Sequence, residues 1–92
     1  MPAPTYELKI ITPQGVVYAG KVSHTRVPVE DGSVGVLAHH ASYVTSSAGG
    51  EIQVMDNEGH EKKFLVGAGF FEVSANHAVF LAQSFTAEPA AS

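Results

Sequence analysis

The sequence predicts an all-β fold, a two-layer β-sandwich of about ten short, mostly antiparallel strands. Apolar residues recur at every second position in short runs, and each run ends at residues that favour turns. No window long enough for a helix carries an apolar stripe of helical period, and β-branched residues are frequent. A chain of 92 residues holds one compact core, so its many short strands bury their apolar faces best when two sheets pack face to face.

The first hairpin is predicted to turn at residues 12–15, TPQG. Before this turn, Tyr6, Leu8 and Ile10 share one face of a strand, and the residues between them are charged. Proline presets φ for a turn, and Gly15 can take the positive φ that closes it. The chain is therefore expected to return through a strand over residues 16–18.

A further strand is predicted over residues 23–29, where alternate residues share a face. Because Pro28 has no N–H group, this strand is expected to lie at a sheet edge or to end there. A clear hairpin follows over residues 51–66: Ile52 and Val54 alternate with polar residues before a turn at residues 56–59, DNEG, and Phe64 and Val66 share a face after it.

The last strands contain a predicted apolar interface. Residues 67–69, Gly-Ala-Gly, predict a bulge or sharp bend, and residues 75–77 predict a turn. The residues expected to face the core here are Phe71, Val73, Val79 and Leu81. This orientation leaves three large apolar residues on outer faces, namely Leu65, Phe70 and Phe80. A contiguous patch of such residues on a small domain indicates a contact surface.

The domain boundary is predicted near residue 85. Residues 1–85 are expected to form the β-sandwich domain. Residues 86–92, TAEPAAS, are small and polar and contain proline, so they are expected to form a flexible C-terminal tail.

Composition argues against two classes of partner. The net charge is −4 and the five lysine and arginine residues are scattered, so no basic stripe can neutralise a nucleic-acid backbone. No stretch approaches the roughly 18 apolar residues that a membrane span requires. The amino terminus lacks the features of a secretory signal, and the absence of cysteine excludes disulfides and thiolate metal sites.

Residues that enzymes favour are crowded into residues 30–44, EDGSVGVLAHHASYV. Ser33, His40 and Asp31 could be assigned the roles of a hydrolase triad. The Gly-x-Ser-x-Gly motif is absent, however, and Asp31 with Gly32 forms an ordinary turn pair. We therefore do not expect a hydrolase triad in this segment.

Metal and phosphate sites are not expected either. The five histidines are His24, His39, His40, His60 and His77. The adjacent pair cannot easily chelate from a strand, because neighbouring side chains point to opposite faces. Gly67 and Gly69 do not open a helix after a strand, so no helix dipole would support a bound phosphate. The expectation is no catalytic residue, no cofactor and no metal.

Several short motifs, in this order and spacing, are similar to one protein family. They comprise residues 11–13, residues 15–18, Gly20, residues 27–28, residues 30–32, residues 35–37, residues 40–41, residues 69–73 and Asn76. Over roughly residues 8–81 the chain resembles the epsilon subunit of the rotary F-type ATP synthase, in its amino-terminal β-sandwich domain. Val29 and Ser42 stand where family members usually have glycine and proline, and residues 67–69 replace a more usual Ser-Gly-Gly.

The resemblance implies a non-catalytic central-stalk subunit of a proton- or sodium-driven ATP synthase, which couples the gamma subunit to the membrane c ring during ATP synthesis. It implies a peripheral place at the cytoplasmic face of a bacterial inner membrane, with membrane contact only through the complex. The implied c-ring-facing loop comprises Pro28, Glu30, Asp31, Gly32, Ser33 and Gly35. The implied gamma-facing residues are Thr12, His40, Ala41 and Tyr43. The resemblance therefore implies that residues 30–44 form a docking loop.

Most members of this family continue into a carboxy-terminal helical hairpin that regulates the enzyme. The chain ends at Ser92, so the inhibitory and nucleotide-binding parts of the family role are not expected. The alternative function is a free-standing β-sandwich domain that binds a ligand or acts as a metal-dependent enzyme. That alternative predicts a deep polar pocket between the sheets, whereas a stalk subunit predicts a filled interior and apolar residues on an outer face.

Overall fold

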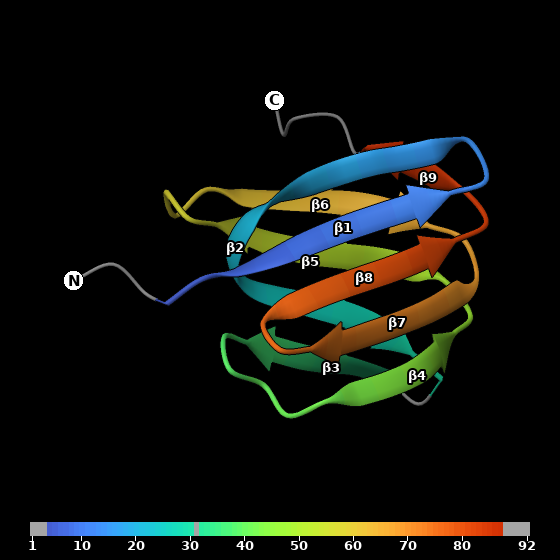
Figure 1. Ribbon diagram of the computed structural model, residues 1–92. Coiled ribbons are helices and arrows are strands. Elements are labelled where there is room, and N and C mark those ends of the chain that lie inside the picture. The colour runs from blue at the N-terminus through green and yellow to red at the C-terminus, as the bar shows by residue number, and fades with distance from the viewer. Residues whose placement is uncertain (1–3, 31, 88–92) are drawn as a thin grey trace.

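The structure is a computed structural model that describes residues 4–30 and 32–87 (Figure 1). The described residues form nine strands: β1 (Tyr6–Thr12), β2 (Gly15–Val29), β3 (Gly32–Leu37), β4 (Tyr43–Ser47), β5 (Gly50–Asp56), β6 (Glu61–Val66), β7 (Gly69–Ser74), β8 (His77–Ala82) and β9 (Phe85–Ala87). The predicted all-β fold is confirmed. The strands expected over residues 16–18 and 23–29 are a single long strand, β2. Within this part of the chain, no helix is long and apolar enough to cross a membrane.

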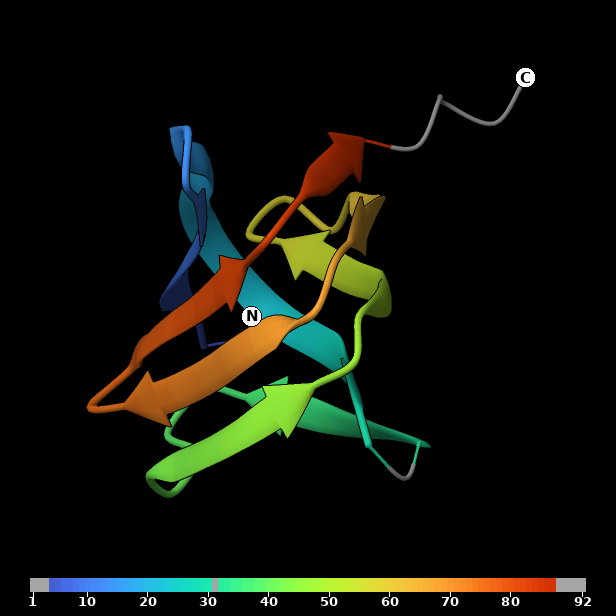
Figure 2. The same ribbon diagram turned by 90° about the vertical axis from the view of Figure 1, so that its right-hand side faces the viewer.

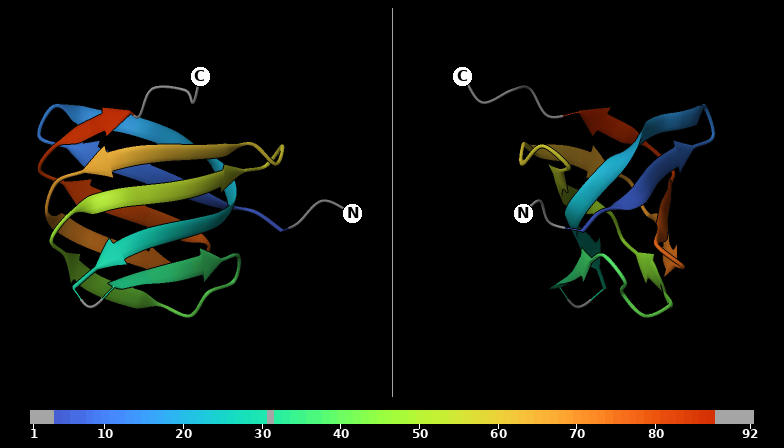
Figure 3. Two further views of the ribbon diagram at one scale, coloured as in Figure 1. Left: turned by 180° about the vertical axis from the view of Figure 1, so that it is seen from behind. Right: turned by 60° about the vertical axis from the view of Figure 1, so that its left-hand side comes forward.

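The strands lie in two layers. A front layer contains β4, β7, β8 and β1, and a rear layer contains β3, β5, β6 and β9 (Figures 1 and 3). Hydrogen bonds connect the strands in the order β4-β7-β8-β1-β2-β5-β6-β9, and β3 pairs with β2. β2 belongs to both layers, because its first half pairs with β1 and its second half pairs with β5 and β3 (Figure 2). This one strand therefore ties the layers together covalently.

Strand pairing is antiparallel throughout the described residues except between β1 and β8, which are parallel from Glu7 opposite His77 to Ile11 opposite Leu81. The turns predicted at residues 12–15 and 56–59 join strands as expected. Gly15 closes the first of these turns with a φ of 117°. The mostly antiparallel pairing that the sequence predicts is confirmed.

The two predicted interruptions have structural causes. Pairing of β2 with β5 stops at Arg26 opposite Gln53, two residues before Pro28, which lacks the N–H group that the ladder would need. Pairing with β3 continues on the other side of β2 as far as Val29 opposite Gly32. Residues 67–68 separate β6 of the rear layer from β7 of the front layer, so the predicted bend is a crossing between layers.

Apolar side chains from both layers form one core. Its members are Tyr6, Leu8, Ile10, Val22, Val27, Val36, Ile52, Val54, Phe64, Val66, Phe71, Val73, Ala78, Phe80 and Ala82. The rings of Phe71 and Phe80 lie 6.4 Å apart between their centroids, and both side chains are fully buried. Burial of a large apolar side chain stabilises a fold by about 1.5–3 kcal/mol, so these residues dominate the packing of the two layers.

The predicted orientation of β8 was wrong. Phe80 lies in the core, whereas Leu81 is 49% exposed. The turn before β8 is two residues long, Ala75 and Asn76, and both have positive φ, 50° and 62°. In the resulting register Phe80 lies directly opposite the buried Phe71, and residues directly opposite each other share a face. The longer turn predicted at residues 75–77 shifts the register by one residue, which reverses every side chain of the strand.

The predicted boundary of the domain also changes. Thr86 and Ala87, which were expected to begin the tail, belong to β9 and pair with Leu65 and Phe64 of β6. The sandwich therefore extends to Ala87. The rest of the expected tail, residues 88–92, lies outside the described residues.

Candidate docking face

An apolar row crosses the outer face of the front layer. Phe70 of β7 lies opposite Leu81 of β8, Leu81 lies opposite Ile11 of β1, and Ile11 lies opposite Val16 of β2. Phe70, Val16 and Leu81 are 59%, 58% and 49% exposed, and Ile11 is half-buried. We call these four residues the apolar row. It carries large apolar groups into solvent on four adjacent strands, which is unusual for so small a domain.

A groove runs beside the apolar row. It has a volume of about 330 Å³, and its lining is Ile11, Thr12, Pro13, Ala68, Gly69, Phe70, Leu81, Ala82 and Gln83. Gly69 is required here, because a Cβ atom at this position would collide with the backbone of Leu81. Close approach of the two strands therefore brings Phe70 and Leu81 together at the edge of the groove. Thr12, predicted to face gamma, also lines this groove.

The predicted apolar interface is only partly assembled. Phe70 belongs to the apolar row, but Phe80 lies in the core. Leu65 is 45% exposed but lies in the rear layer, opposite Glu51 of β5 and Thr86 of β9 (Figure 3). The outer faces of the two layers point in opposite directions, so Leu65 and Phe70 cannot serve one contact surface.

Sequence reasoning missed Val16, Ile11 and Leu81 as members of the apolar row. The signal for Leu81 was present, since a two-residue turn at residues 75–76 would have placed it outside. Val16 lies opposite Ile11 only because the pairing of β1 with β2 shifts register between Ile10 and Ile11. Alternation alone cannot reveal such a bulge.

The predicted c-ring-facing residues gather on the β2–β3 hairpin. Pro28 lies opposite Ser33, and Gly35 lies opposite Arg26. Glu30 follows the end of β2, and Gly32 begins β3 with a φ of 132°, a conformation that favours glycine. Asp31 lies outside the described residues.

The predicted gamma-facing residues form two groups. His40, Ala41 and Tyr43 lie in the β3–β4 loop and at the start of β4. The ring centroids of His40 and Tyr43 are 6.1 Å apart in an edge contact, and the Nδ1 atom of His40 lies 2.7 Å from the carbonyl oxygen of Ala41.

Thr12 lies at the other end of the front layer. Pairing across the layer aligns Tyr43 with Leu8, which precedes Thr12 by four residues of β1. Four residues of a strand span about 13 Å. Thr12 and the His40 group would therefore contact different parts of any partner that covers this layer.

The residues considered for a hydrolase triad are not brought together. Ser33 lies near the start of β3, whereas His40 lies beyond its end, so the length of the strand separates them. The candidate orienting carboxylate, Asp31, is outside the described residues. The predicted interpretation of residues 30–44 as a docking segment is compatible with this arrangement.

A potential ligand cluster occurs in the β5–β6 turn. Within the described residues, ligand atoms of Asp56, Glu58 and His60 lie within 4.8 Å of one another. The Asp56 carboxylate already accepts hydrogen bonds from the backbone N–H groups of His60 and Glu58, at 2.8 and 2.9 Å, and the Lys62 ammonium lies 3.9 Å away. The His60 backbone hydrogen bond, aided by that of Glu58 and by the nearby Lys62 ammonium, lowers the pKa of Asp56. The cluster is explained by closure of the turn.

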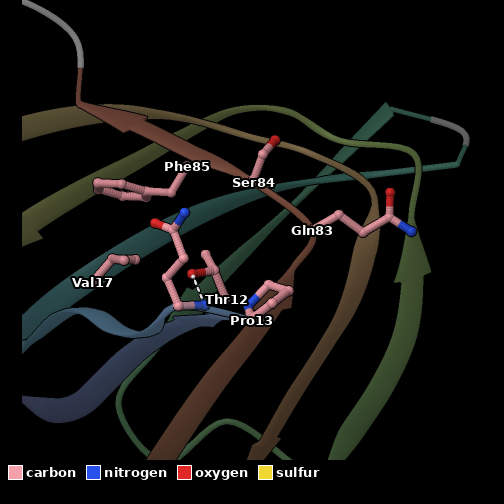
Figure 4. A pocket seen from close by; sticks show the side chains of 7 residues that line it. Thr12, Pro13, Val17, Gln83, Ser84 and Phe85 are labelled. Atoms are coloured by element: carbon pink, nitrogen blue, oxygen red, sulfur yellow. Dashed lines mark hydrogen bonds between the residues drawn. The ribbon is translucent and has the colours of Figure 1, made fainter.

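A second hollow lies at the rim of the molecule, where the β1–β2 turn meets the β8–β9 connection (Figure 4). It has a volume of about 210 Å³ and is lined by Thr12, Pro13, Gln14, Val17, Gln83, Ser84 and Phe85. Within this lining, the Gln14 backbone N–H donates a hydrogen bond to Oγ1 of Thr12, at 3.1 Å. None of the lining residues is charged, so the hollow offers no carboxylate or imidazole for acid–base chemistry.

The fold defines a small, two-layer all-β domain with an apolar outer face. The family model for the β-sandwich domain of the ATP synthase delta/epsilon chain matches residues 5–88. The chain belongs to this family, which confirms the resemblance found in the sequence.

Bacterial relatives share this assignment. The ATP synthase epsilon chain of Latilactobacillus sakei is 42% identical over 77 residues, which are 82% of this chain and 53% of the relative. The ATP synthase epsilon chain of Chlorobium limicola is 31% identical over 78 residues, 85% of this chain and 89% of the relative. The chain thus spans about half the length of the first relative and most of the second.

Solved structures share the fold. A chain of the Euglena gracilis mitochondrial ATP synthase, in a structure of OSCP/F1/c-ring, superposes with a TM-score of 0.85 at 19% identity and covers 95% of this chain and 56% of that chain. A chain of the Tetrahymena thermophila mitochondrial ATP synthase, in a structure of the central stalk and c ring, gives a TM-score of 0.75 at 15% identity, with coverage of 95% and 69%.

Proposed function

We propose that this chain is a non-catalytic subunit of the central stalk of a rotary ATP synthase and joins the gamma subunit to the c ring. Membership of the delta/epsilon family supports the proposal, as do relatives that are named ATP synthase epsilon chains. The named relatives are bacterial, which supports a peripheral place at the cytoplasmic face of a bacterial inner membrane. The role requires no cofactor and no nucleic acid.

The apolar row is the observation that carries the proposal. Three of its side chains expose about half of their surface or more, and they are adjacent on one face. Removing such a side chain from water is worth about 25 cal/mol for each Å² of apolar surface. In the proposed complex the gamma subunit covers the apolar row and the neighbouring Thr12, and another part of it contacts the segment formed by His40, Ala41 and Tyr43.

The β2–β3 hairpin is the proposed contact with the c ring. Gly32 and Gly35 carry no side chains, so a partner can approach the backbone closely. Glu30 and Ser33 are exposed and can accept hydrogen bonds from polar loops of the ring. Membrane contact in this arrangement occurs only through the ring.

The sandwich suits the transmission of torque between these two contacts. The front layer carries the apolar row, and the β2–β3 hairpin extends from β2, which pairs with strands of both layers. A close-packed core has low compressibility, so a load applied at one surface reaches the other without large deformation. The domain would therefore act as a rigid coupling block.

Native mass spectrometry of the chain mixed with the cognate gamma subunit and c ring tests the proposal. The expected species are a complex with gamma and a larger complex that also contains the ring. A chain that stays monomeric with both partners present would rule the proposed function out.

A further inference from the structure

Asn76 connects three segments of the chain. Its side-chain Oδ1 accepts a hydrogen bond from the backbone N–H of His39 at 2.7 Å, and its carbonyl oxygen accepts one from the N–H of Glu7 at 3.1 Å. Asn76 itself lies in the β7–β8 turn. One residue therefore joins this turn to the start of β1 and to the β3–β4 loop.

The hydrogen bond from His39 holds the loop in a demanding conformation. His39 has a φ of 63°, in the left-handed region that only a few per cent of non-glycine residues adopt, although histidine enters it more often than most. Such a conformation persists only where neighbouring structure stabilises it. Asn76, with a φ of 62°, belongs to the residue type that tolerates this region.

Within the described part of the chain, the other side-chain hydrogen bonds of the loop beyond His39 are either local or long. The imidazole of His40 contacts the carbonyl oxygen of the next residue, Ala41, which is a local contact. The hydroxyl of Ser42 donates to that of Ser74 at 3.3 Å, a long distance for a bond between two hydroxyl groups. Among the described residues, the hydrogen bond to Asn76, at 2.7 Å, is a shorter link from the loop to the front layer than the one between Ser42 and Ser74.

We infer that Asn76 is a positioning residue for the gamma-facing segment formed by His40, Ala41 and Tyr43. This inference rests on the proposed function. Asn76 acts through His39: it fixes the direction in which the chain enters the segment, so the segment is already in its docking conformation before gamma arrives. When only a fraction of molecules is competent to bind, the apparent dissociation constant rises in inverse proportion to that fraction.

Two substitutions separate the side-chain acceptor from the backbone conformation. Asn76→Gly keeps the left-handed φ at no steric cost but removes Oδ1. Asn76→Asp keeps an oxygen acceptor and also tolerates this φ. Asn57→Gly, in the β5–β6 turn of the rear layer, is the matched control for the entropic effect of glycine.

The test combines amide hydrogen exchange at His39 with the affinity of the full chain for purified gamma subunit. For Asn76→Gly we expect exchange at His39 to accelerate about fivefold, the equivalent of one typical hydrogen bond, and the affinity for gamma to fall measurably, by up to that factor. We expect Asn76→Asp and Asn57→Gly to remain within about twofold of the unchanged chain in affinity. Urea unfolding of each variant measures its global stability, so that an effect on the loop can be distinguished from a general loss of stability.

Two results would overturn the inference. One is Asn76→Gly binding gamma as tightly as the unchanged chain; the other is Asn76→Asp losing as much affinity as Asn76→Gly. Failure of the unchanged chain to bind gamma would instead reject the proposed function, and the inference with it.

Discussion

The hydroxyl groups of Tyr6 and Thr25 form a hydrogen bond of 2.6 Å inside the core, although the two residues are 19 positions apart in the sequence. The Tyr6 hydroxyl also donates to the carbonyl oxygen of Val36 at 2.8 Å. Tyr6 is 3% exposed and Thr25 is fully buried. This contact joins β1, β2 and β3 and satisfies buried polar groups that would otherwise destabilise the sandwich.

Tyr6→Phe should destabilise the fold by about 1–3 kcal/mol, because it leaves the buried Thr25 hydroxyl and Val36 carbonyl without this partner. Urea unfolding measures the change. Tyr43→Phe is the matched control, since Tyr43 is only half-buried, and we expect it to be nearly neutral. Equal effects of the two substitutions would contradict a structural role for the Tyr6 hydroxyl.

Stability should fall at alkaline pH. Burial raises the pKa of Tyr6 from 10.0 to about 12, and the hydrogen bond with Thr25 opposes this shift only in part. Between these values the folded chain keeps a proton that the unfolded chain releases, so the stability present below pH 10 is lost as pH rises toward 12. Urea unfolding from pH 8 to 12 measures the slope.

Tyr6→Phe should flatten this alkaline slope without abolishing it. The pKa of Tyr18 is also raised, first by burial and then by the charge of Asp56, so a second tyrosine contributes in the same direction. An unchanged slope in the Tyr6→Phe variant would show that other groups control the transition.

Asp56 should stabilise the β5–β6 turn at neutral pH and cease to do so in acid. Its pKa lies below the ordinary value of 3.8, so the folded chain binds fewer protons than the unfolded chain in that range. The stability it contributes is present above about pH 4 and is lost as pH falls through the lowered pKa. Asp56→Asn should reduce stability at pH 7 and make the acid unfolding transition less steep. Circular dichroism during an acid titration measures this transition. Identical transitions for the variant and the unchanged chain would contradict the prediction.

The apolar row should be necessary for binding gamma. The double substitution Phe70→Ser and Leu81→Ser should weaken binding by at least about tenfold, because it removes two large apolar groups from the contact. Both side chains are half or more exposed, so the fold should tolerate the change. Leu65→Ser, at an exposed apolar residue of the rear layer, should leave the affinity unchanged in isothermal titration calorimetry.

Gly69→Ala should destabilise the fold by about 2 kcal/mol or more, because the added methyl group collides with the backbone of Leu81. Gly59→Ala is the control: its φ of 86° costs about 1 kcal/mol, but the space around it is open. Thermal unfolding ranks the two variants. A smaller loss at Gly69 than at Gly59 would show that β7 and β8 can separate at little cost.

Local chemistry made part of the molecule predictable. The turns at residues 12–15 and 56–59 follow from the proline, glycine and asparagine residues in them. The alternation of buried and exposed side chains in the adjoining strands follows from the period of a strand. The residues that the resemblance implies to face the c ring occupy one short segment, and those described lie on one hairpin. The tail boundary could not be predicted, because β9 exists only through its pairing with β6.

The sequence by itself determined the all-β class, the positions of the main hairpins and the family, since each depends on residues that are near one another in the chain. The tertiary structure alone decided which residues form the candidate docking face. Val16, Ile11, Leu81 and Phe70 become neighbours only when β2, β1, β8 and β7 pair in one register. The physical reason is the period of two along a strand: a turn that is one residue shorter places Phe80 in the core and Leu81 in solvent.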